Sequence, residues 1–125
     1  MAFSMVKHLG GLSRQLVAKA IQVPVRVSPT ETFDLKDLFQ REIASWHRSM
    51  TLRVGAVQRT VNKDLQEGRI SLGDVANPAR FIVNSIALHT LEQMMVSAGH
   101  FDNLHELRQA EWHDLLHKHV ESIDI

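Results

Sequence analysis

The chain of 125 residues contains no cysteine and no tyrosine, and its aromatic residues are five phenylalanines and two tryptophans. Without cysteine, disulfides, thiolate nucleophiles and cysteine metal sites are excluded. So few aromatic side chains argue against a platform that stacks nucleic-acid bases, and a net charge of zero provides no long-range attraction for a phosphate backbone. No glycine loop of the GxxxxGK or GxGxxG form is present, and no catalytic signature stands out. We therefore expect no enzyme, no cofactor and no nucleic-acid partner.

Acidic residues are also missing from the first 30 positions, which carry four basic residues, while the remaining 95 carry 14 acidic and 10 basic residues. Apolar residues in this basic segment recur at helical spacing. A cationic, acid-free amphipathic helix is typical of a mitochondrial targeting segment or of a helix on a membrane surface; an ordinary packed N-terminal helix is the alternative. Within residues 1–22, the residues predicted to contact lipid or a partner are Val6, Leu9, Leu12 and Leu16 on the apolar side and Lys7, Arg14 and Lys19 on the basic side.

Residues 23–33 are predicted to form an extended linker. The segment from Val23 to Pro29 contains two prolines and three valines, and a proline disfavours the helical conformation of the residue before it. The remaining residues, 34–125, are predicted to form a helical domain, with Thr30 or Thr32 suited to cap its first helix.

The first helix of that domain is predicted to be long. No proline intervenes between Leu35 and Leu65, and apolar residues recur in steps of three and four that make an eleven-residue repeat. About 32 residues give a rod of about 48 Å, which the rest of the chain is expected to leave partly uncovered. We therefore predict that a partner covers it; the alternative is a helix that breaks near Gly55 and folds back into a compact bundle. The predicted partner-binding residues on this helix are Trp46, Met50, Val54, Val57 and Val61.

A third helix is predicted to begin at Asn77, a favoured cap, with Pro78 in its first turn, and to end near Ala98 before Gly99. Its length matches a bilayer, but it contains ionisable residues that are costly in lipid. We therefore predict a helix buried in protein at a membrane edge, with a bilayer-spanning helix as the alternative. The predicted partner contacts on this helix are Phe81, Ile82 and Leu88.

A last helix is predicted from Asp102 or Asn103 to Ser122, where Asn103 and Glu106 have the spacing of a capping box. No strand pattern of any length appears outside the linker. The predicted fold class is therefore all-α: a basic amphipathic N-terminal helix, an extended linker with prolines, one long helix, and two further helices.

Histidines gather near the C-terminus. His113 and His117 are four residues apart, so on a helix they share a face that can bridge a zinc or copper ion. A zinc-protease motif requires Glu directly after the first histidine, but Asp114 follows here. We predict no metal, and keep this pair as the alternative. Glu92 follows His89 by three residues and can share a proton with it in a buried setting, but a partly exposed Glu92 is expected instead.

Taken in order, five features resemble subunit g of mitochondrial ATP synthase over residues 6–101: the basic amphipathic start, the proline-containing linker, the long polar helix, the Ser71-Leu72-Gly73-Asp74 connector and the apolar helix that follows. The resemblance implies a subunit that catalyses nothing. Its start would lie along the membrane, its long helix beside the peripheral stalk, and its last helix across the bilayer, paired with subunit e through GxxxG. Residues 78–99 contain no GxxxG, and residues 103–125 are additional.

These patterns predict a non-catalytic structural or accessory subunit of a mitochondrial inner-membrane complex, above all of the membrane region of ATP synthase, with a role in assembly, dimer formation or cristae shaping. The expected partners are other subunits of the complex and, at the N-terminus, membrane lipid. The alternative is a soluble helical binding or regulatory module, linked to a metal through the histidine-rich C-terminal helix.

Overall fold

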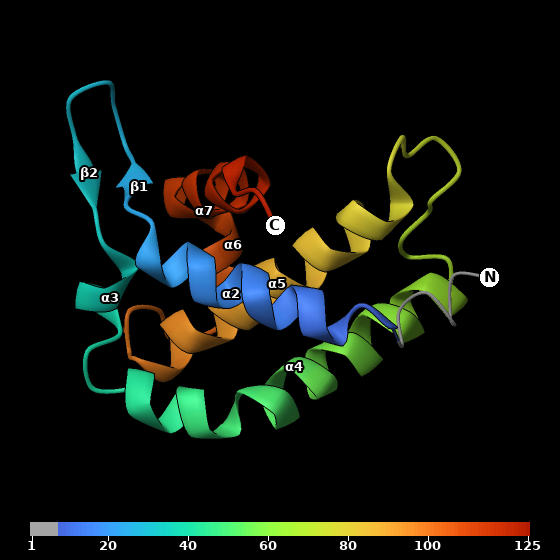
Figure 1. The fold of residues 1–125 in the computed structure, drawn as a ribbon, viewed down its shortest axis with the longest axis horizontal. Helices are drawn as coiled ribbons and strands as arrows, with labels where there is room; N and C mark the ends of the chain where they lie inside the picture. Colours follow the sequence, from blue (N-terminus) through green and yellow to red (C-terminus); the bar gives the residue numbers. More distant parts are fainter. Residues whose placement is uncertain (1–7) are drawn as a thin grey trace.

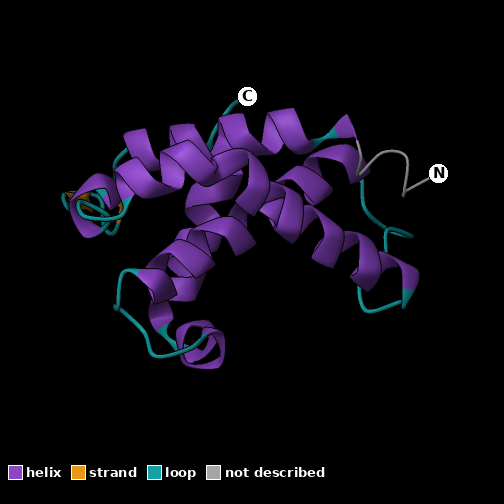
Figure 2. Cartoon of the chain, turned by 90° about the horizontal axis from the view of Figure 1, so that it is seen from below, coloured by secondary structure: helices purple, strands orange, loops and turns teal. Residues whose placement is uncertain are grey.

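The structure, a computed structural model, describes residues 8–125. These residues form six helices and one two-stranded ribbon (Figure 1), so the protein is all-α, as the sequence predicts. Figure 2 shows the ribbon at one edge of the helical body. In chain order the elements are α2 (Gly10–Gln22), β1 (Val25–Arg26), β2 (Thr32–Phe33), α3 (Leu35–Leu38), α4 (Ile43–Gln66), α5 (Pro78–Ser97), α6 (Leu104–Gln109) and α7 (Glu111–Ser122).

Helix α5 is the centre of the fold. It packs against α2, α4, α6 and α7, and half of its 20 residues are buried. Because neighbours surround it, a helix with apolar residues on nearly every side is stable here. Its ends are formed as predicted: Asn77 Oδ1 accepts a hydrogen bond from the Arg80 backbone N–H at 3.1 Å, Pro78 lies in the first turn, and Gly99 adopts a φ of 83° beyond the last turn.

The predicted extended linker, residues 23–33, is a short antiparallel hairpin. Its register places Val25 opposite Phe33. Val25 is buried while Arg26 is exposed, which is the alternation expected of a ribbon that lies on a core. The ring of Phe33 lies 4.5 Å from that of Trp112 on α7. The hairpin is therefore packed onto the helices.

The predicted long helix is in fact two helices. Helix α3 ends at Leu38, and a turn at residues 39–42 leads into α4, whose 24 residues span about 36 Å. The turn keeps Leu35 and Phe39 in the core, where both are fully buried. Helix α4 continues unbroken through Gly55, so a break at that glycine is also wrong, although the chain does fold back into a bundle.

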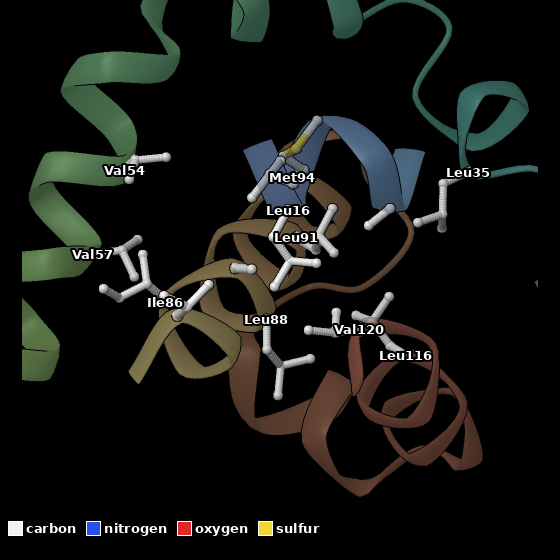
Figure 3. Packing of buried hydrophobic residues seen from close by; sticks show 14 of the residues in the cluster. Leu16, Leu35, Val54, Val57, Ile86, Leu88, Leu91, Met94, Leu116 and Val120 are labelled. Carbon is white, nitrogen blue, oxygen red and sulfur yellow. The ribbon is translucent and has the colours of Figure 1, made fainter. Parts of the chain in front are cut away.

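The apolar stripe of α4 is covered by the protein itself. Trp46, Val54, Val57 and Val61 are buried, because α4 packs against α2 and α5. Figure 3 shows Val57 of α4 beside Ile86 of α5 within the buried cluster. Each such side chain contributes about 1.5–3 kcal/mol to this fold. The prediction that these four residues bind a partner, and that the stripe needs one, is therefore wrong.

The C-terminal segment is also divided. Asn103 Oδ1 accepts a hydrogen bond from the Glu106 backbone N–H at 2.9 Å, as the capping pattern predicts. The single predicted helix is instead interrupted at Ala110, whose ψ is 151°. This extended residue reorients α7 relative to α6, and both Leu107 of α6 and Leu116 of α7 are fully buried.

Candidate functional sites

Helix α2 belongs to the core. Leu9 and Leu16, two of the residues predicted to meet lipid or a partner, are buried, whereas Leu12 is exposed. The prediction is therefore wrong for Leu9 and Leu16, because α5 and α4 already cover the inner side of this helix. The packed helix given as the alternative describes α2. Val6 and Lys7 lie outside the described residues.

The basic residues of α2 contact other parts of the chain. Arg14 Nη1 donates a hydrogen bond to Thr51 Oγ1 of α4 at 2.7 Å, and Lys19 Nζ donates one to the Asp124 carbonyl at 2.8 Å. These contacts join α2 to α4 and to the C-terminal end. Removal of residues 1–22 as a targeting segment would therefore open the core.

Only one of the three predicted partner-binding residues on α5 is accessible to a partner. Phe81 is exposed, whereas Ile82 and Leu88 are buried in the protein's own core, so the prediction is wrong for those two. Within residues 8–125, no helix combines the length and the hydropathy needed to cross a bilayer.

The outward side of α4 carries a basic stripe. Arg48, Leu52, Arg59 and Lys63 are spaced so that they share one helix face, and all four are exposed. We call these four residues the basic outer face of α4. Leu52 is 77% exposed, the largest exposure among the large hydrophobic side chains of the described part. No ion pair within residues 8–125 involves the three basic residues.

Charge is unevenly distributed between the two ends of the chain. Helix α2 and the part of α4 up to Lys63 carry six basic residues and no acidic residue, whereas residues 102–125 carry six acidic and two basic residues. A neutral net charge therefore conceals a cationic side built from α2 and α4. The sequence itself shows the α4 part of this cationic side, because no acidic residue lies between Ile43 and Lys63.

A groove of about 530 Å³ lies between α2 and the first half of α4. Its deepest residues are Trp46 of α4 and Met94 of α5, both buried, and Met50, a predicted partner-binding residue, is half-buried in its wall. Arg14 and His47 contribute the ionisable groups of the lining, which contains no acidic residue. A cavity of this size is in the range of small-molecule sites.

A second cleft, of about 320 Å³, lies between α5 and the α6–α7 segment and contains a buried carboxylate. Glu92 is 1% exposed, and its carboxylate accepts hydrogen bonds from Arg108 Nε at 3.0 Å and Nη2 at 3.4 Å. His113 Nε2 lies 3.2 Å from the same carboxylate. The expected partly exposed Glu92 is therefore wrong, because α6 brings a guanidinium over it.

His89 lines this cleft but is not the partner of Glu92. Burial of the imidazole lowers the pKa of His89 below its ordinary value of 6.5, an effect that the nearby Glu92 opposes and Arg108 reinforces. The nearby hydroxyl of Ser85 donates to the Phe81 carbonyl at 2.9 Å. No nucleophile within residues 8–125 is thus paired with a base in this cleft, and the carboxylate serves to hold α6 and α7.

The two histidines considered for a metal are each paired with a carboxylate. The ring centroids of His113 and His117 are 6.4 Å apart, and His117 Nδ1 lies 2.7 Å from Glu121 Oε1. Among the residues that the structure describes, no group of three or more histidine and acidic side chains is arranged to hold a metal ion.

No protein-family model, curated protein or solved structure matches this chain.

Proposed function

We propose that this protein is a non-catalytic accessory protein that rests on the anionic surface of the mitochondrial inner membrane through the basic outer face of α4. The observation that carries the proposal is the exposed Leu52 among three basic residues, on a helix with no acidic residue before Asp64. Each basic residue near an anionic leaflet contributes about 1 kcal/mol of attraction. An exposed leucine beside them can enter the interfacial region of the bilayer.

The mitochondrial assignment rests on the acid-free first 30 residues, which have the composition of an import signal. Because α2 is packed in the core, this signal would stay on the folded protein. The order of parts that resembles subunit g makes the membrane region of ATP synthase the complex to test first. Because the core is enclosed by the chain itself, we expect the protein to fold alone and to bind its surface afterwards. A soluble helical module, the alternative, shares this self-contained fold but does not bind the membrane.

A non-catalytic role is supported by the state of the polar cleft. Its buried carboxylate, Glu92, accepts two hydrogen bonds from Arg108 and lies 3.2 Å from His113 Nε2, so its oxygen atoms are already engaged within the chain. These contacts join α5 to α6 and α7, so we assign them to stability.

The test is sedimentation of the purified full-length protein with vesicles of phosphatidylcholine, with or without cardiolipin. The wild type should bind only the cardiolipin vesicles, and less as salt rises. Changing Arg48, Arg59 and Lys63 together to Gln should lower the partition coefficient about a hundredfold, since three contributions of about 1 kcal/mol are lost.

The matched control changes three exposed basic residues elsewhere, Arg26, Lys36 and Lys118, together to Gln. It has the same net charge as the first variant, so it should retain most of the wild-type binding. Equal losses in both variants would mean that overall charge, not the outer face of α4, determines binding. Either that result or absence of wild-type binding to cardiolipin vesicles would contradict the proposal.

A further inference from the structure

The groove between α2 and α4 has an apolar interior. Its walls are formed by Ile21 on α2 and by Ile43 and Met50 on α4, all half-buried, and its base by Trp46 and Met94. Methionine side chains adapt to irregular apolar surfaces. The half-buried walls of the groove are reached from solvent, so an apolar group can lie between them, above Trp46 and Met94, which are 1% and 0% exposed.

One end of the groove is closed. There the end of the Gln58 side chain of α4 lies against α2, so that a side-chain carbon at Gly10 would be 3.0 Å from Gln58 Oε1. Further along, the hydrogen bond from Arg14 to Thr51 joins the two helices. From Arg14 to Gln22, the open part follows α2 for about 12 Å. A groove of this length that is closed at one end suits one alkyl chain better than a peptide helix, which would have to pass through both ends.

The ionisable groups at the groove favour an anion. Arg14 uses one N–H toward Thr51, and a guanidinium has five such donors, in a planar arrangement that matches a carboxylate. His47 is the second ionisable lining residue, and no Asp or Glu lines the groove. A ligand with an apolar tail and a negative head is therefore complementary to it, whereas a cationic amphiphile is not.

We propose that this groove binds one medium-chain aliphatic carboxylate, with its head at Arg14 and its tail along Met50, Trp46 and Ile21. The site is separate from the basic outer face of α4, because Arg48 and Leu52 point away from α2 while His47, Met50 and Thr51 line the groove. The inference holds whether or not the protein binds a membrane.

The groove can be tested by fluorescence, because only two tryptophans are present and Trp46 lies in its base. In full-length protein carrying Trp112→Phe, we titrate dodecanoate below its micelle concentration and without vesicles. Dodecanoate should change the Trp46 emission saturably, with one site per chain by calorimetry. Hexanoate, with its shorter tail, and dodecyltrimethylammonium, with the opposite charge, should each bind at least about tenfold more weakly.

Two variants locate the site. Ala18→Leu places a larger side chain on the exposed part of the groove wall and should abolish binding, and because Ala18 is exposed the fold should persist, as circular dichroism will check. Arg14→Gln should weaken binding about tenfold, since a charge-assisted hydrogen bond is lost. Arg26→Gln, outside the groove, should leave binding unchanged.

The groove proposal is overturned if Ala18→Leu binds dodecanoate like the wild type, if Arg14→Gln and Arg26→Gln behave alike, or if the cationic amphiphile binds equally well. The outer-face variant at Arg48, Arg59 and Lys63 should bind dodecanoate normally. Failure of vesicle binding with normal dodecanoate binding would therefore refute only the membrane proposal, and the reverse result would refute only this one.

Discussion

Arg108 Nε donates a hydrogen bond to Glu92 Oε2 across 3.0 Å, which joins the short helix α6 to a buried carboxylate of α5. Glu92 is 1% exposed and Arg108 44% exposed, so one member of the pair is in the protein interior and the other reaches solvent. Such a pair is costly to break from the exposed side, because the carboxylate that remains is buried without its counter-ion.

Arg108→Met should therefore lower the free energy of unfolding by about 2 kcal/mol. This is less than the roughly 3–5 kcal/mol typical of a fully buried pair, because Arg108 is partly exposed and water can partly replace it. Lys118→Met, which removes an exposed cation on α7, should change stability by less than about 0.5 kcal/mol. Urea denaturation measures both.

A double variant separates the ion pair from the packing of Arg108. Glu92→Leu combined with Arg108→Met removes both charges, so it should recover most of the stability lost in Arg108→Met alone. If the double variant is as unstable as the sum of the two single variants, the buried charge is not the cause of the loss.

Stability should fall on mild acidification, in part through His89. Burial lowers its pKa in the folded state below the ordinary value of 6.5. The unfolded chain therefore binds a proton as pH falls below about 6.5 while the folded protein does not, so the folded state loses stability until the lowered pKa is reached. His89→Gln should show a smaller drop in melting temperature between pH 7.5 and 5.5 than the wild type does. An identical drop in both proteins would exclude this contribution.

The position of α2 in the core gives a prediction that distinguishes a structural helix from a targeting segment that the fold does not need. Leu16 is fully buried, so Leu16→Ala should cost about 3 kcal/mol in the free energy of unfolding. Leu12→Ala, on the exposed side of the same helix, should cost less than about 1 kcal/mol. Equal and small effects at the two positions would mean that α2 does not hold the core together.

Local signals in the sequence predicted three helix ends correctly but missed those at Leu38 and Ala110. The predicted cap at Thr30 or Thr32 is wrong, because Thr32 lies in β2 and Asp34 precedes α3. The side chains of Asn77 and Asn103 each accept a hydrogen bond from the backbone N–H three residues further on, and so cap their helices. Gly99 follows the last turn of α5 with a positive φ, which glycine adopts without strain. The apolar period of α4 likewise identified its inner side. Periodicity shows which side of a helix is apolar but not what covers that side. The covering elements here, α2 and α5, precede and follow α4 in the sequence and are separated from it by the hairpin and by the connector after Gly68.

The buried state of Glu92 was missed for a related reason. Its partner Arg108 is 16 residues away, and the pair exists only because the chain turns back after Gly99 and places α6 against α5. No local pattern encodes that return. The basic outer face of α4, in contrast, can be partly predicted from the sequence, because no acidic residue lies between Ile43 and Lys63. The structure adds which basic residues of this segment face solvent.

The proposed membrane orientation can be measured directly, because the chain has no cysteine and a single one can be introduced for labelling. An environment-sensitive fluorophore is attached to Leu52→Cys on α4 or, as control, to Lys118→Cys on α7, and each protein is mixed with cardiolipin-containing vesicles. The account predicts a blue shift for the label at position 52 and none at position 118. A shift at position 118 alone, or no shift at either position, would contradict it.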